Sequence, residues 1–251
     1  MSIFRSIVFT SALAGLIVGV AVTAVQQVGT IPLIAKAEVF EQKTETGKPA
    51  VAAQPAPAHS HETGAHAHAA GAAHDHGPGA WAPADGFERN AYTALFNVLE
   101  WIGFGMVLAG GLVLSRRRAN WREGLLWGMG GFAAFGLAPG LGLPPELPGM
   151  PAAELVPRQL WWVGTAAATA AGLAMIAFRP SVAWCVAGIA LIALPHAIGA
   201  PQPVGVESSV PEAMSRQFVV AVTLTTFLSW ALLGALSGYL LTKFGSERAE
   251  S

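Results

Sequence analysis

Six apolar stretches of 17 to 24 residues constrain this chain more than any other feature. They cover residues 7–28, 91–114, 125–143, 161–178, 182–198 and 218–241. A helix needs about 20 residues to cross a hydrocarbon core of about 30 Å. Only helices and closed barrels satisfy their backbone in lipid, and the alternating strands of a barrel are absent from this sequence. Only 12% of the residues are charged, against about 25% in typical soluble domains. The sequence therefore predicts an all-α polytopic membrane protein with about six transmembrane helices in a lipid bilayer.

Two of the six stretches leave alternatives open. The stretch 125–143 contains six glycines and Pro139, so a broken or re-entrant segment is an alternative to a plain helix. The stretch 7–28 follows Arg5, as the core of a signal peptide would. Its apolar run is longer than the roughly 7–15 residues of such a core, so an uncleaved first helix is predicted.

The distribution of Lys and Arg predicts the orientation in the membrane. The cluster Arg116–Arg118 and Arg122 dominates the short loops, and cytoplasmic loops are enriched in Lys and Arg. Both termini are then cytoplasmic. The predicted divisions are a first helix and its exit (1–34), an external loop (35–90), a five-helix bundle (91–246) and a cytoplasmic tail (247–251). Within the loop, residues 47–84 are mainly Ala, Gly, Pro and His, which predicts disorder.

A short pattern precedes the second, fourth and sixth stretches. It reads acid, three residues, arginine, amide: Asp85-x3-Arg89-Asn90, Glu154-x3-Arg158-Gln159 and Glu212-x3-Arg216-Gln217. Repeats of equal orientation can be related by an axis along the membrane normal. The pattern favours three tandem two-helix hairpins with the acid–arginine pairs at the outer mouth. The alternative is that helices entering lipid commonly begin with charged residues.

Six of the seven histidines form three His-x-His pairs in the predicted external loop. They are His59, His61, His66, His68, His74 and His76. Imidazole is a preferred ligand of divalent transition metals, and side chains at i and i+2 of an extended chain share a face. The alternative is a solvated polar linker. The spacing favours a metal-binding segment that does not specify which metal it binds.

Polar residues inside the apolar stretches predict a pathway. Asn90, Thr93, Asn97 and Glu100 recur at spacings of 3, 4 and 3, which is one helix face. An ionised carboxylate at the depth of Glu100 costs about 2.5 kcal/mol or more unless it is paired, metal-bound or hydrated. Similar faces carry Arg158, Thr165 and Thr169, and Arg216, Thr223 and Thr226. His196, near the outer end of the fifth stretch, is predicted to face the same axis as Glu100. The alternatives are a buried structural pair or protonated acid for Glu100, and an interfacial hydrogen bond for His196.

Several functions are disfavoured by what the sequence lacks. There is no phosphate-binding loop and no catalytic Ser-His-Asp or paired-cysteine pattern, so an enzyme is not expected. The net charge of −1 gives no reason to expect a nucleic-acid partner. A single cysteine, Cys185, allows no disulfide within the chain.

Four segments carry a recognisable combination of motifs. They are GTIPLIAKAEVFE at 29–41, LGLPPELPGMPAAEL at 141–155, RQLWW at 158–162 and LPHAIGAPQP at 194–203. Together they resemble the CbtA family of predicted cobalt transporter subunits. The resemblance implies a bacterial inner-membrane protein, usually described with five membrane helices, that works with a small CbtB-like single-helix subunit and is linked to cobalamin biosynthesis. It marks Glu38, Glu154 and His196 as motif residues without assigning them a role.

The sequence and the resemblance together predict import of a divalent transition metal. Cobalt is the leading candidate, with nickel or zinc as alternatives. The histidine loop would capture the ion in the periplasm, and the bundle would pass it inward. The competing hypothesis is a metal-binding membrane accessory or storage protein that conducts nothing. The sequence leaves open whether the protein forms a homo-oligomer.

Overall fold

The structure is a computed structural model that describes residues 3–46, 83–84, 86–116, 119–179, 181–203, 205 and 208–246. Its elements are α1 (Ile3–Val28), α2 (Ile31–Thr46), α3 (Phe87–Leu114), α4 (Trp121–Phe132), a π-helical turn η1 (Ala133–Leu137), α5 (Ala138–Gly142), α6 (Leu155–Phe178), α7 (Val182–Ile198) and α8 (Glu212–Ser246). Five spans are long and apolar enough to cross a membrane, namely α1, α3, the 121–142 segment, α6 and α8. Helix α7 is apolar but has only 17 residues. The described chain is therefore the polytopic helical membrane protein that the sequence predicts.

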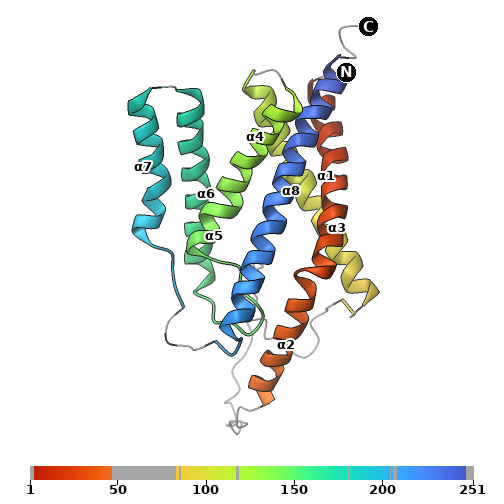
Figure 1. The fold of residues 1–251 in the computed structure, drawn as a ribbon, viewed down its shortest axis with the longest axis vertical. Helices are drawn as coiled ribbons and strands as arrows, with labels where there is room; N and C mark the ends of the chain where they lie inside the picture. The colour runs from red at the N-terminus through yellow and green to blue at the C-terminus, as the bar shows by residue number, and fades with distance from the viewer. Residues whose placement is uncertain are drawn as a thin grey trace, which may run out of the picture.

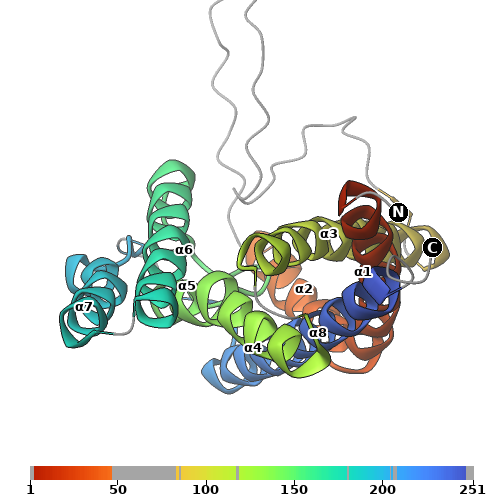
Figure 2. The ribbon, with the colours of Figure 1, turned by 90° about the horizontal axis from the view of Figure 1, so that it is seen from above.

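The apolar helices alternate in direction, so that α1 begins and α8 ends at the same end of the molecule (Figure 1). We call this the terminal end and the opposite one, which holds α2, the distal end. Viewed along the bundle, α6 and α7 stand to one side of a group formed by α1, α3, α4 and α8 (Figure 2). Helix α8 is 35 residues long, or about 52 Å at 1.5 Å per residue, so it extends beyond the roughly 30 Å core of a bilayer.

Side-chain caps define the short turns at the terminal end. Asn120 accepts hydrogen bonds from the backbone N–H groups of Arg122 and Glu123 at the start of α4. Ser181 accepts one from Trp184 at the start of α7. These bonds satisfy amides that have no partner inside the helix, which is why the sequence can turn back within a few residues.

The helices do not pair as three equivalent hairpins, and in this respect the sequence interpretation is wrong. Only the first expected hairpin, α1 with α3, forms an extensive packed pair. Helix α4 packs mainly along α8 instead of α6, and α6 packs mainly along α7. The predicted threefold arrangement of acid–arginine pairs therefore has no counterpart in the way the helices pack.

Glycines decide these pairings because they let two backbones touch. Gly124 and Gly128 of α4 lie against Gly234 and Gly238 of α8, and a Cβ on Gly234 would come within 2.3 Å of the Gly124 carbonyl oxygen. Gly172 of α6 and Gly188 of α7 face each other in the same way. The glycines are four residues apart in both Gly124-x3-Gly128 and Gly234-x3-Gly238. This spacing brings small residues onto one helix face.

The glycine-rich third stretch is continuous rather than broken. It runs from Trp121 to Gly142 as a single span that contains the π-helical turn η1. The Ala138 N–H bonds the carbonyl of Ala133, five residues earlier. Pro139 follows directly and has no N–H, so the regular α-helical bonding cannot continue across this point. Such turns occur often at functional sites, and η1 brings Phe135 and Gly136 to the cleft described below.

A second apolar cluster closes the distal end. Leu33 and Ala37 of α2 pack with Leu147 of the loop before α6, with Val210, and with Phe218 of α8. Helix α2 therefore has an apolar face with a buried partner, and the two distal loops are anchored to the bundle rather than free. Phe218 of this cluster, and Ile34 packed against it, line the cleft described below.

Candidate functional site

A cleft of about 1040 Å³ lies in the distal half of the bundle. Its walls come from α1, α2, α3, α4, η1, α5, α6, α8 and the loop that precedes α6. Helix α7 contributes no lining residue among those described. The α6–α7 pair stands to one side of the other helices (Figure 2), and the lining of the cleft includes residues of α3, α6 and α8.

Polar side chains from four helices line this cleft. They are Gln26 of α1, Asn97 and Glu100 of α3, Arg158 and Gln159 of α6, and Thr223, Thr225, Thr226 and Ser229 of α8. Thr30, in the turn between α1 and α2, also lines it. The predicted pathway residues Asn97, Glu100 and Arg158 thus lie around one space. Thr223 and Thr226 join them as the spacing indicates. Thr165 and Thr169 do not, because they share the face of α6 that carries Gly172 and are buried.

Glu100 is the acidic residue of the cleft that has no protein partner. Its carboxylate makes no hydrogen bond and no ion pair within the described part of the chain. It lies in the middle of α3, which is long and apolar enough to span a membrane. An unpaired carboxylate at such a depth is costly unless water or a cation reaches it. The cleft provides that access.

Asn97 is held one helical turn before Glu100. Its side chain is only 8% exposed. Its amide nitrogen Nδ2 donates to Thr23 Oγ1 at 3.0 Å and to Gln26 Oε1 at 2.7 Å, both on α1. These bonds are possible because Gly15 and Gly19 bring α1 against the backbone of α3 at Ile102 and Val98. The α1–α3 pair thereby places amide groups along the wall of the cleft.

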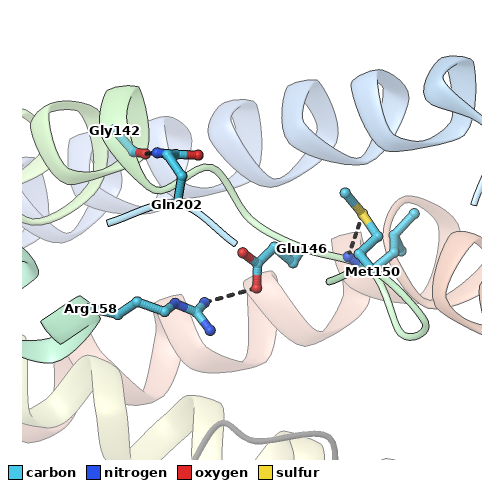
Figure 3. Close-up of polar contacts among 6 residues, drawn as sticks. Gly142, Glu146, Met150, Arg158 and Gln202 are labelled. Carbon is cyan, nitrogen blue, oxygen red and sulfur yellow. Dashed lines mark hydrogen bonds and ion pairs between the residues drawn. The ribbon is translucent and has the colours of Figure 1, made fainter. Parts of the chain in front are cut away.

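Arg158 is paired, but not with the acid that the sequence pattern indicated. Its Nη2 lies 2.8 Å from Glu146 Oε2, and both side chains are about three-quarters buried. Figure 3 shows the two side chains pointing toward each other, with Gln202 hydrogen-bonded to the Gly142 carbonyl nearby. Glu154 is exposed at the start of α6, and among the lining residues described it is absent. The loop before α6 places Glu146, rather than Glu154, beside Arg158.

Of the two other acid–arginine pairs in the pattern, the structure describes one. Glu212 and Arg216 form an exposed pair one turn apart, at 3.3 Å. Asp85 lies outside the described residues. Arg89 bonds Glu38 of α2. Glu38 therefore ties α2 to the start of α3 and is not among the lining residues that the structure describes.

An aromatic cluster forms the floor of the cleft. The rings of Trp101, Phe104, Phe135 and Trp230 make five contacts in this cluster, with centroids 4.9 to 5.9 Å apart. Phe135 and Trp230 are stacked, with ring planes only 7° apart. The same two residues also border a second, apolar groove of about 620 Å³ between α3, α4 and α6. The cluster therefore separates a polar distal cleft from an apolar groove nearer the terminal end.

His196 lies away from the cleft, so the structure does not bring it together with Glu100. Its ring contacts Trp161 edge-on, with centroids 5.8 Å apart. Trp161 donates from Nε1 to the Pro195 carbonyl at 3.2 Å. Trp161 also covers Gly142, where a Cβ would come within 2.2 Å of its ring. These contacts join the ends of α5 and α7 to α6, which gives the 194–203 motif a structural role.

The six loop histidines fall outside the described residues. Within the described part of the chain, no group of three or more His, Cys, Asp or Glu side chains could hold a metal ion. A cation in the cleft would therefore meet one unpaired carboxylate together with neutral oxygens and water.

Sequence patterns did not identify the aromatic floor or Glu146. Trp101, Phe104, Phe135 and Trp230 stand at apolar positions of helices, where a core role is the simplest interpretation. Their common location depends on the α4–α8 pairing. That pairing could have been found from the two Gly-x3-Gly sequences.

Several membrane-spanning helices around a polar cleft with an unpaired carboxylate form the architecture of a membrane transport protein. The particular family follows from the sequence as a whole. Residues 4–242 match the family described as "Probable cobalt transporter subunit (CbtA)", and the chain belongs to that family. No curated protein and no solved structure matches the chain. Membership supports metal transport in general and, through the word subunit, the existence of a partner.

Proposed function

We propose that this chain forms the ion pathway of a cobalt importer. The observation that carries the proposal is Glu100, an unpaired carboxylate within a membrane span that lines a large cleft. Asn97, Gln26 and the α8 hydroxyl groups provide neutral oxygens beside it. In this proposal the aromatic cluster closes the path toward the terminal end. Cobalt as substrate rests on the family to which the chain belongs.

The distribution of positive charge supports inward transport. The terminal end holds Arg5, Arg116, Arg122 and Arg179 on short segments, and positive residues favour the cytoplasmic side. The distal cleft and the histidine loop would then face the periplasm of a bacterial inner membrane. A divalent cation moving inward gains about 4.6 kcal/mol per 100 mV. That free energy corresponds to about three decades of accumulation without ATP.

The word subunit in the family description supports a partner. We assign this role to a small single-helix membrane protein of the CbtB type, on the strength of the resemblance in the four motif segments. The same resemblance supports a supply of cobalt to cobalamin biosynthesis. The chain itself carries no catalytic constellation in this proposal.

Uptake of radioactive cobalt by sealed right-side-out vesicles tests the proposed function. Vesicles that contain the chain with its partner are expected to accumulate Co²⁺ in response to an inside-negative potential, and to lose this accumulation when the potential is collapsed. A panel of Ni²⁺ and Zn²⁺ establishes selectivity. Binding of Co²⁺ without accumulation would favour a non-conducting accessory or storage protein instead.

Replacing the six loop histidines with alanine is expected to raise the KM for cobalt uptake and leave the maximal rate nearly unchanged. The proposed reason is that the loop concentrates the ion near the cleft and is not part of the path. Binding by the loop should also weaken below about pH 6, because protonated imidazole is not a ligand. The measurement is uptake over a cobalt series at pH 7.5 and pH 5.5. Equal KM values for the wild type and the variant at pH 7.5 would show that the loop does not contribute to uptake.

A further inference from the structure

Thr23 lies beside the cleft, where its hydroxyl group makes hydrogen bonds both to a backbone carbonyl and to a side chain that lines the cleft. Its hydroxyl donates to the Gly19 carbonyl at 2.8 Å. A hydroxyl has one hydrogen, so toward any other group the Thr23 oxygen can only accept. The group that it accepts from is Asn97 Nδ2.

This arrangement determines which way the Asn97 amide points. The two amide hydrogens are used by Thr23 and by the Gln26 side-chain oxygen. If the amide were reversed, its oxygen would face two acceptors. The Asn97 oxygen Oδ1 is thus the part of this buried side chain that has no partner among the described residues, and Asn97 lines the cleft.

Glu100 follows Asn97 by three residues on the same helix, and both line the cleft. Side chains three apart on a helix are neighbours, with Cβ atoms about 5–6 Å apart. A cation between them could be bound by both, with water completing its coordination. One charged and one neutral oxygen are few ligands, which suits an ion that must leave again.

We propose that Asn97 Oδ1 and the Glu100 carboxylate form a paired-oxygen subsite for a divalent cation, and that Thr23 is the positioning residue that turns the Asn97 oxygen toward it. This inference rests on the proposed cation transport and names the residues that hold the ion on its way. Gly19 participates indirectly, because its lack of a side chain allows α3 to approach α1 at Val98.

The test compares Thr23→Val with Thr23→Ser. Valine has nearly the shape of threonine but cannot orient the amide, whereas serine keeps the hydroxyl. Thr23→Val is expected to raise the KM for cobalt uptake about tenfold, the effect of losing one ligand contact of about 1.4 kcal/mol, with the maximal rate per folded protein retained. Thr23→Ser is expected to restore the wild-type KM. A purely structural role would lower the amount of folded protein without changing the KM.

Thr93→Val is the matched control. Its spacing predicted a place on the pathway, but Thr93 is not among the lining residues of the cleft that the structure describes. The Thr93 hydroxyl makes the same kind of bond, to the Arg89 carbonyl four residues earlier at 2.9 Å, but orients no lining side chain that the structure describes. Its KM is expected to equal that of the wild type. A tenfold change in Thr93→Val as well, or an unchanged KM in Thr23→Val, would overturn the assignment of Thr23.

A binding measurement separates this inference from the transport proposal. Co²⁺ is titrated by calorimetry into the full chain in lipid nanodiscs, with the six loop histidines replaced by alanine in every variant. The subsite predicts that Thr23→Val and Asn97→Leu weaken binding at least about tenfold relative to this background. If these variants lose affinity while the wild type fails to transport, the subsite stands and the transport proposal falls. If uptake is normal while both variants bind Co²⁺ like the background, the subsite is wrong.

Discussion

Replacement of Glu100 by glutamine is expected to reduce cobalt uptake at low cobalt concentration by a factor of about ten to a hundred. Glutamine keeps the shape of the side chain and removes its charge. An interaction with a charged group contributes about 1.5–3 kcal/mol of binding free energy, and losing it corresponds to this range of factors. Folding should be unaffected, because the carboxylate supports no hydrogen bond or ion pair in the described part of the chain. Initial uptake rates in vesicles, normalised to the folded protein present, provide the measurement.

Glu88→Gln is the control for this variant. Glu88 lies near the start of the same helix and is partly exposed. It accepts a hydrogen bond from the Ala84 N–H and does not line the cleft as described. Its uptake should match the wild type. If Glu100→Gln transports normally at every cobalt concentration, Glu100 is not a ligand and the proposed path along α3 is wrong.

The second large effect is expected from Gly234→Ala, which should destabilise the fold by about 3 kcal/mol or more. The added Cβ would lie 2.3 Å from the Gly124 carbonyl oxygen and 2.8 Å from the Gly128 Cα. Both are backbone atoms of α4, so no side chain can rotate to make room. The α4–α8 pair would have to separate, and the wall of the cleft at Phe135 and Trp230 would separate with it. Thermal unfolding of the purified protein in detergent measures the loss.

Gly103→Ala provides the comparison. Gly103 also lies within a spanning helix, but a Cβ there would meet no atom within 4 Å. Alanine has the higher helix propensity, so this variant should be as stable as the wild type or slightly more stable. Equal thermal stability of Gly234→Ala and Gly103→Ala would show that backbone contact does not hold α4 against α8.

Much of the site could be predicted from local patterns. The spacing of Asn97 and Glu100 placed both on one face of α3, and the spacing of Thr223 and Thr226 did the same on α8. These residues line one cleft, as expected of polar residues in apolar helices, which must find a polar environment. The same reasoning failed for Thr165 and Thr169, whose face is taken up by the contact of Gly172 with Gly188. His196 was misplaced relative to Glu100 because α7 packs on α6 at the edge of the bundle.

The sequence by itself determined the class of fold and the position of nearly every membrane-spanning helix, because hydrophobicity and helical period are local properties of the chain. It also indicated the family through four motif segments. The tertiary structure alone decided which helices touch, which acid pairs with Arg158, and that four aromatic rings from α3, η1 and α8 close one cleft. Those features depend on where glycines allow two backbones to meet, and such contacts join residues as far apart in sequence as Gly124 and Gly234.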